Sequence, residues 1–224
     1  MDAEERPEEK KGGKTFLIAL AIIIVVVAVL LLAIKQFRPQ PKTLDQMLDD
    51  TLNGKFGPDN YLYNNYAFVR SNGLWVTRWQ KNGNIYTIPL RFGPLELENL
   101  TIVGDLDKRF DPKNLYITFD PTAEPLGYVA LGAAELSINL ATALDTAPIA
   151  ACIKNETVAC ATRPIVSCQD NDKAVIFIRE SNETAVILNG NCIVIQGEGM
   201  NLLKAVDRVL YIWYGIMPRG IIPQ

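Results

Sequence analysis

The chain has 224 residues, a formal net charge of −3 and no histidine. The lack of histidine excludes Ser-His-Asp hydrolases, Cys-His proteases and nearly all catalytic zinc sites, because each of these needs an imidazole. The mildly acidic balance, without any basic cluster, argues against nucleic-acid binding, which requires a surface that neutralises phosphates.

An apolar run near the N-terminus predicts a membrane anchor. Residues 1–14 mix glutamates with lysines and are expected to form a disordered cytoplasmic tail. Residues 16–34 are then all apolar, and about 20 such residues span a hydrocarbon core roughly 30 Å thick. A cleaved signal peptide is the alternative, but its apolar part usually has only about 7 to 15 residues. Residues 15–35 are therefore predicted to be an uncleaved transmembrane helix that contacts the lipid bilayer through residues 16–34.

The charges that flank the anchor favour a cytoplasmic N-terminus, although only slightly. Basic residues before the anchor outnumber those after it: Arg6, Lys10, Lys11 and Lys14 against Lys35, Arg38 and Lys42. Three glycosylation sequons agree with a domain on the outer side of the membrane: Asn99-Leu-Thr101, Asn155-Glu-Thr157 and Asn182-Glu-Thr184. The predicted location is the cell membrane, with a single span and the C-terminal domain outside the cytoplasm.

The four cysteines predict two disulfides: Cys152, Cys160, Cys168 and Cys192. They are even in number and lack C-x-x-C spacing, and disulfides form in oxidising compartments, so they also favour the outer location. Four reduced core cysteines in a cytosolic domain are the alternative. Of the three possible pairings, Cys152–Cys160 with Cys168–Cys192 is predicted, because sequential pairing closes the smallest loops at the least cost in chain entropy.

Residues 36–42 are predicted to be a linker in which Pro39 and Pro41 end the anchor helix. Thr43 is then expected to cap a short amphipathic helix that stops at Gly54. Residues 43–110 as a whole are expected to form a β-meander subdomain. Strand-like runs at 66–70, 74–79 and 85–90 are joined by the hairpin dipeptides Asn72-Gly73 and Asn82-Gly83. Pro89 is expected on a sheet edge or at a bulge.

Residues 111–224 are expected to form an α+β subdomain that holds the disulfides. A strand is predicted at 100–103, before this subdomain, and further strands within it are predicted at 115–119, 148–153, 174–178, 185–188 and 192–196. A helix over about 124–144, with Asp120 or Thr122 as its cap and Pro125 in its first turn, is expected to be largely buried. A second membrane span is the alternative, which Glu135 disfavours because a charge is costly in lipid.

A last helix over about 200–214 is predicted from apolar residues at helical spacing. These should face the core, whereas Lys204, Asp207 and Arg208 should lie outside that stripe. The fold class is therefore predicted to be α+β, with an N-terminal transmembrane helix, an antiparallel β-meander and two long helices packed on sheet.

Three carboxylates near the predicted strand-to-helix junction are candidate acid or base groups: Asp111, Asp120 and Glu124. Capping by Asp120 and solvent exposure of the others is the favoured interpretation. Glu135 and Asn139, one helical turn apart, could form a buried pair with a raised carboxyl pKa, in a functional or a structural role.

Two further patterns have both a functional and a structural interpretation. Gly197-Glu-Gly199 resembles a phosphate-binding loop in outline, but an ordinary turn uses the same residues, so no cofactor or metal is predicted. Trp75 and Trp79 should share one face of a strand, with Tyr61, Tyr63 and Tyr66 nearby in the chain. This aromatic group could bind a sugar or a partner protein, although packing beneath the helices is favoured.

The layout also resembles that of type IV pilin-like proteins. An apolar N-terminal helix preceded by Lys11-Gly12 leads into an α+β domain with cysteines, and the resemblance implies a surface subunit. The chain departs from the pattern at Lys14 and Thr15, which separate the glycines from the apolar run. It also has no acid inside that run, and prolines follow it.

Together these features predict a membrane-anchored extracytoplasmic domain of the cell envelope that binds a protein or a surface polymer and has no catalytic activity. The main alternative is an extracytoplasmic carboxylate-dependent enzyme or a ligand-sensing domain. An enzyme of that kind would bring two acids together in a cleft, about 5 to 9.5 Å apart. A pilin-like surface subunit is the lesser alternative.

Overall fold

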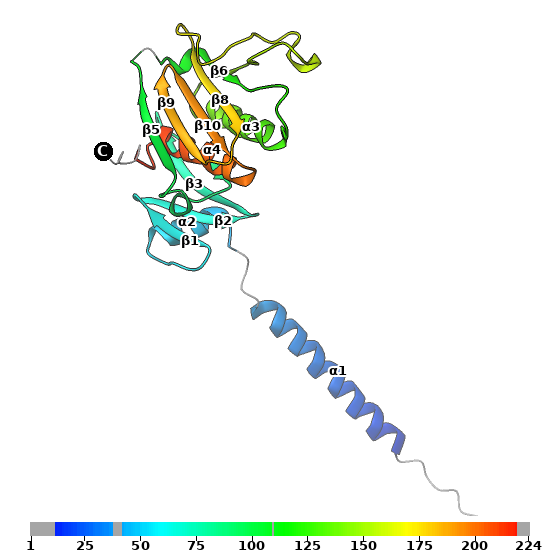
Figure 1. Ribbon diagram of the computed structural model, residues 1–224. Helices are drawn as coiled ribbons and strands as arrows, with labels where there is room; N and C mark the ends of the chain where they lie inside the picture. The colour runs from blue at the N-terminus through cyan, green and yellow to red at the C-terminus, as the bar shows by residue number, and fades with distance from the viewer. Residues whose placement is uncertain (1–11, 38–41, 109, 219–224) are drawn as a thin grey trace, which may run out of the picture. The chain divides into compact units, whose positions relative to one another are not determined.

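The structure, a computed structural model, describes residues 12–37, 42–108 and 110–218, and it divides into two compact units. The first unit, Met1–Lys42, contains helix α1 (Gly12–Phe37), and the second, Thr43–Gln224, contains all the other elements (Figure 1). Within α1 the stretch Phe16–Ala33 is long and apolar enough to cross a membrane, and none of it is buried. The predicted tail before residue 12 and the linker prolines Pro39 and Pro41 lie outside the described residues.

The predicted meander is an antiparallel four-stranded sheet in the order β1-β2-β3-β4. Its strands are β1 (Asn60–Tyr63), β2 (Tyr66–Ser71), β3 (Leu74–Lys81) and β4 (Asn84–Leu90). The turn dipeptides Asn72-Gly73 and Asn82-Gly83 have positive φ at both positions, as tight hairpins require. The turn Asn64-Asn65 does the same and adds strand β1, which the pattern analysis did not predict. Pro89 lies in the edge strand β4, as expected.

Helix α2 (Leu44–Leu52) precedes the meander and packs on it. Thr43 caps this helix as predicted, because its side chain accepts a hydrogen bond from the backbone N–H of Gln46. The Gln46 side chain accepts in turn from the N–H of Thr43, which completes a capping box. Leu48, Ala67 and Val69 form a small buried cluster between helix and sheet.

A second sheet has six strands in the order β5-β9-β10-β8-β6-β7. These are β5 (Thr101–Leu106), β6 (Leu115–Thr118), β7 (Ile149–Ala150), β8 (Ala174–Glu180), β9 (Ala185–Gly190) and β10 (Cys192–Gly197). Strands β10, β8, β6 and β7 are parallel to one another, and β9 runs antiparallel to β10. The strand expected at 148–153 is only two residues long, because Cys152 leaves the sheet edge and forms an isolated β-bridge with Ile165.

Helices α3 (Gly127–Thr142) and α4 (Met200–Trp213) pack against each other and against the six-stranded sheet (Figure 1). Helix α3 is shorter than expected, since it covers only Gly127–Thr142; the Glu124–Pro125 peptide bond that precedes it is cis. Its N-cap is Leu126, without a side-chain hydrogen bond, so the predicted capping by Asp120 or Thr122 is wrong. The three remaining helical turns are the 3₁₀ segments η1 (Pro94–Glu96), η2 (Pro112–Asn114) and η3 (Val158–Cys160).

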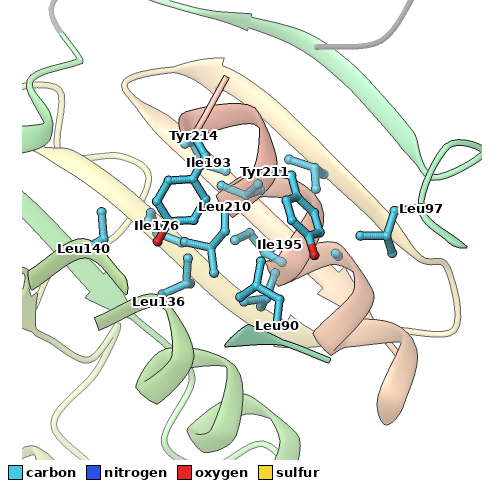
Figure 2. Packing of buried hydrophobic residues seen from close by; sticks show 14 of the residues in the cluster. Leu90, Leu97, Leu136, Leu140, Ile176, Ile193, Ile195, Leu210, Tyr211 and Tyr214 are labelled. Carbon is cyan, nitrogen blue, oxygen red and sulfur yellow. The ribbon is translucent and has the colours of Figure 1, made fainter. Parts of the chain in front are cut away.

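The main core lies around α4, which contacts both sheets. On one side it packs on β9 and β10. On the other side the Tyr211 ring makes an edge-to-face contact with Phe68 of the meander. Figure 2 shows Tyr211 and Tyr214 of this region among buried leucines and isoleucines from α3, α4 and the six-stranded sheet. This position buries nearly the whole of α4, so the expectation that Asp207 and Arg208 lie outside the core is wrong: they are 0% and 2% exposed.

Both disulfides link the predicted cysteine pairs. Cys152 is bonded to Cys160, with the Cα atoms 6.0 Å apart, and Cys168 to Cys192, with the Cα atoms 5.3 Å apart. The second bridge packs beside Val166 and Val175 on the face of the six-stranded sheet that the helices do not cover.

Candidate functional site

A groove of about 520 Å³ runs along α3, beside the edge of the six-stranded sheet that the short strand β7 forms. We call it the α3 groove. Strand β6 and the segment after it form one wall, α3 forms another, and the loop closed by the Cys152–Cys160 disulfide forms the third. The lining residues are Ile117, Phe119, Pro121, Leu126, Val129, Ala130, Ala133, Ala134, Ser137, Ala150, Thr157, Ala159 and Arg163.

The groove exists because short side chains face a short strand. On α3, the residues that point toward it include Ala130, Ala134 and Ser137, spaced by about one helical turn. Beyond β6, the edge strand β7 has only two residues, so little sheet is present to fill the space. As a result α3 is buried on one side only, and the expectation that it is largely buried is wrong for Ala130, Ala134 and Ile138, which are exposed.

Three polar side chains line this otherwise apolar surface. Ser137 is satisfied, since its hydroxyl donates to the backbone oxygen of Ala133 at 2.7 Å. Thr157 has a buried hydroxyl without a hydrogen-bond partner among the described residues. The Arg163 side chain is exposed and, within the part of the chain that the structure describes, has no carboxylate partner. The groove therefore offers one unsatisfied hydroxyl and one uncompensated positive charge.

The loop that carries Arg163 is held in place at several points. The Cys152–Cys160 disulfide closes the loop just before it, and the Arg163 N–H donates to the Cys160 oxygen at 3.2 Å. Cys152 also exchanges backbone hydrogen bonds with the segment that follows, donating to Pro164 at 3.1 Å and accepting from Val166 at 2.9 Å. The guanidinium group thus extends, at the rim of the groove, from a segment that is anchored beside the disulfide-closed loop.

The predicted candidate acids Asp111 and Asp120 have separate structural roles. Asp111 caps η2 by accepting from the Lys113 N–H at 3.0 Å. Asp120 accepts from the Thr122 N–H at 2.9 Å and pairs with Lys154 at 3.2 Å. These contacts, the backbone bond above all, hold the pKa of Asp120 below its usual value.

Glu124, the third candidate acid, lines a different hollow of about 450 Å³ together with Glu180 and Glu198. It lies at the carboxyl ends of the parallel strands β8 and β10, where ligands often bind in α/β sheets. The described residues contain no group of three or more metal-binding side chains that could hold an ion. We call this feature the acidic hollow.

Gly197-Glu-Gly199 forms the turn between β10 and α4, and the backbone explains both glycines. A Cβ on Gly197 would lie 2.6 Å from the Leu202 backbone nitrogen, and Gly199 has a φ of 56°. The Gly199 N–H donates to the Glu180 carboxylate at 3.0 Å. A carboxylate of the chain itself therefore occupies the position that the phosphate-loop interpretation assigned to a bound anion.

A buried polar cluster joins α3, α4 and the end of the meander. Arg91 and Glu135 form an ion pair, and burial raises the pKa of Glu135 against the opposing effect of Arg91. Asp207 accepts from the backbone N–H groups of Arg91 and Phe92. Burial, followed by the nearby Glu135 charge, raises the pKa of Asp207 well above its usual value. The sequence around Glu135 predicts its raised pKa but gives no sign of Arg91 or Asp207 beside it.

Glu135 and Asn139 do not pair through their side chains. The Asn139 amide donates to the Glu135 backbone oxygen at 2.9 Å, and its oxygen accepts from the Tyr214 hydroxyl at 2.6 Å. Asn139 therefore links α3 to the end of α4, and Glu135 is available to balance Arg91.

The tryptophans of β3 serve packing. The Trp75 indole N–H donates to Glu96 at 2.8 Å, and that of Trp79 donates to the Tyr214 backbone oxygen at 2.8 Å. Tyr61 stacks on Phe68 and meets Trp75 edge-on. These aromatic side chains therefore pack within the protein, which is the interpretation that the sequence favours.

Comparisons with known proteins add no relative: no family model, no curated protein and no solved structure matches this chain. Sequence patterns did not predict the residues that make the groove distinctive, Thr157 and Arg163. The spacing of small residues along 130–137 was the only signal, and it is equally typical of tight helix packing.

Proposed function

We propose that this chain is a membrane-anchored, non-catalytic binding domain held outside the cytoplasm, and that the α3 groove is its binding site. The observation that carries the proposal is the groove itself: about 520 Å³, mostly apolar, with a hydroxyl and a cation at its wall. Small-molecule sites have this size, an apolar lining and a few polar groups that orient the ligand.

The proposed location rests on three features of the chain. The stretch Phe16–Ala33 has the length and composition of a membrane span. Both cysteine pairs are disulfides, which persist in oxidising compartments. The sequon asparagines Asn99, Asn155 and Asn182 are all exposed, as a glycosylation site requires. The first supports a membrane anchor, and the other two support a domain on the outer side of the membrane.

Binding is favoured over catalysis because two of the candidate acids, Asp111 and Asp120, are engaged in separate structural contacts. Asp111 caps a 3₁₀ turn and Asp120 is neutralised by Lys154. Neither lines the groove or the acidic hollow. In contrast, the Thr157 hydroxyl and the Arg163 guanidinium of the groove have no partner in the described part of the chain, which is the condition expected of groups that await a ligand.

The test is photolabelling of the full-length chain in the membranes of cells that express it. A hexadecanol derivative with a photoreactive diazirine on its alkyl chain is added, and the peptides that carry adducts are mapped by mass spectrometry. We expect adducts within 126–137 and 157–163. Ala134→Phe, which fills the groove from an exposed position, should reduce them severalfold.

Ile138→Phe is the matched control, because Ile138 is on the same helix, is 62% exposed and does not line the groove. This variant should keep wild-type labelling. Adducts confined to α1, or equal labelling of Ala134→Phe and the wild type, would reject the groove as a binding site.

A second candidate function is an extracytoplasmic enzyme or ligand sensor that uses the acidic hollow. The observation in its favour is the convergence of Glu124, Glu180 and Glu198 at the carboxyl ends of β8 and β10. Glu180 is already engaged with the Gly199 N–H, which accounts for its position structurally. Glu124→Gln should leave groove labelling unchanged, and loss of an activity in that variant alone would favour the enzyme.

A further inference from the structure

We infer that the ligand of the α3 groove is a single-chain fatty acid, with its alkyl chain on α3 and its carboxylate on Arg163. The inference rests on the proposed function, since it names the chemical class of ligand for the same groove. It follows from the lining, the charge and the anchoring of the loop that bears the charge.

The alkyl chain is assigned to the apolar length of the groove. The small residues Ala130, Ala133 and Ala134 form a smooth surface along α3, opposite Ile117 and Phe119. Such a surface offers no hydrogen bond that would fix a polar ligand, but it removes methylene groups from water. Each methylene that it covers should strengthen binding about fourfold.

The carboxylate is assigned by charge complementarity. Arg163 is the charged residue that lines the groove, and none of the described residues provides a carboxylate for it. A guanidinium group binds a carboxylate through two parallel hydrogen bonds, a geometry that favours one compact anionic head group. Lys154, on the same loop, is already paired with Asp120 and Glu156, so it supplies no second free charge.

Two further observations agree with an anionic head at this position. The unsatisfied Thr157 hydroxyl lies in the disulfide-closed loop that immediately precedes Arg163, and it can donate to a carboxylate oxygen. The Cys152–Cys160 disulfide fixes this loop, and backbone hydrogen bonds join Arg163 and Pro164 to its two cysteines, so that less conformational entropy is lost when Arg163 binds.

The test compares two photoreactive probes on the full-length chain in membranes: a diazirine derivative of hexadecanoic acid and the matched hexadecanol. We expect the acid to label the groove peptides more strongly than the alcohol. Arg163→Gln should lower labelling by the acid about three- to tenfold, the range expected for a charge-assisted pair at a partly exposed site, and leave labelling by the alcohol unchanged. Lys113→Gln removes an exposed charge that does not line the groove, and it should have no effect.

Competition distinguishes the sources of the acyl chain. Unlabelled hexadecanoic acid should displace the probe, whereas vesicles of diacyl phosphatidylglycerol should not. Displacement by the phospholipid alone would overturn the single-chain assignment. Equal labelling by acid and alcohol, with no effect of Arg163→Gln, would overturn the anionic head while the binding site remains. Absence of groove adducts with both probes would overturn the proposed function as well.

Discussion

Asp207 on α4 accepts a hydrogen bond of 2.9 Å from the backbone N–H of Phe92, although 115 positions separate the two residues. The same oxygen accepts from the Arg91 N–H at 3.0 Å. The carboxylate is completely buried, so these two amides have no access to water as an alternative partner. Asp207 therefore fastens the end of the meander to the helix layer.

We predict that Asp207→Ala destabilises the protein by about 2 to 4 kcal/mol, because two buried N–H groups lose their acceptor. Asp207→Asn keeps an oxygen for both amides and should cost less than about 1 kcal/mol. Chemical denaturation of the full chain in detergent, followed by tryptophan fluorescence, measures both changes. Equal destabilisation by the two substitutions would show that the acceptor oxygen is not what matters.

The raised pKa of Asp207 also predicts a dependence of stability on pH. The folded protein keeps this proton at pH values where the unfolded chain has already lost it, so stability falls as the pH rises from the ordinary aspartate pKa through the raised one. Asp207→Asn removes this contribution, and the variant should gain stability relative to the wild type as the pH rises. Denaturation midpoints measured from acid to neutral pH test this, and parallel curves would contradict it.

Asp120→Asn should change stability by less than about 1 kcal/mol at neutral pH, because the ion pair with Lys154 is partly exposed. Asparagine can still accept from the Thr122 N–H. The pKa of Asp120 is lowered, so the charge stabilises the fold above the ordinary pKa and that gain is lost as the pH falls. Wild type and variant should therefore converge in strong acid. A loss of groove labelling in a folded Asp120→Asn protein would assign this residue a role in binding.

Non-reducing peptide mapping should recover two crosslinked peptides, one joining Cys152 to Cys160 and one joining Cys168 to Cys192. Replacement of Cys168 and Cys192 by serine should cost about 2 to 4 kcal/mol, the usual value for a bridge that closes a loop of this order. A peptide that joins Cys160 to Cys168 would mean that the loop beside the groove is arranged differently.

A protease added to intact spheroplasts should digest the chain after Thr43 and spare the tail before Lys14. Terminal epitope tags report which part survives, and permeabilised cells serve as the control in which both parts are digested. A protected domain with a digested tail would reverse the proposed orientation and remove the compartment argument drawn from the disulfides.

Several features of the protein follow from the sequence alone, because the signals that produce them are local. The helix around Phe16–Ala33 depends on an unbroken apolar run, and the meander depends on Asn72-Gly73 and Asn82-Gly83, which accept positive φ. The cysteine pairing follows from short spacings along the chain, since nearby partners close the smallest loops.

Other features are decided only when distant segments meet. Periodicity along α4 identifies one apolar stripe, but the meander encloses this helix from a second side, so Asp207 and Arg208 are buried as well. Capping rules predict Asp120 or Thr122 as the cap of α3, but Lys154 and Thr122 engage the Asp120 carboxylate before the helix begins. The α3 groove arises because a two-residue strand and a stapled loop meet small side chains of α3 across the fold. A pattern within one segment carries no information about which surface of another segment will face it, so neither the groove nor its free arginine was predictable from the chain alone.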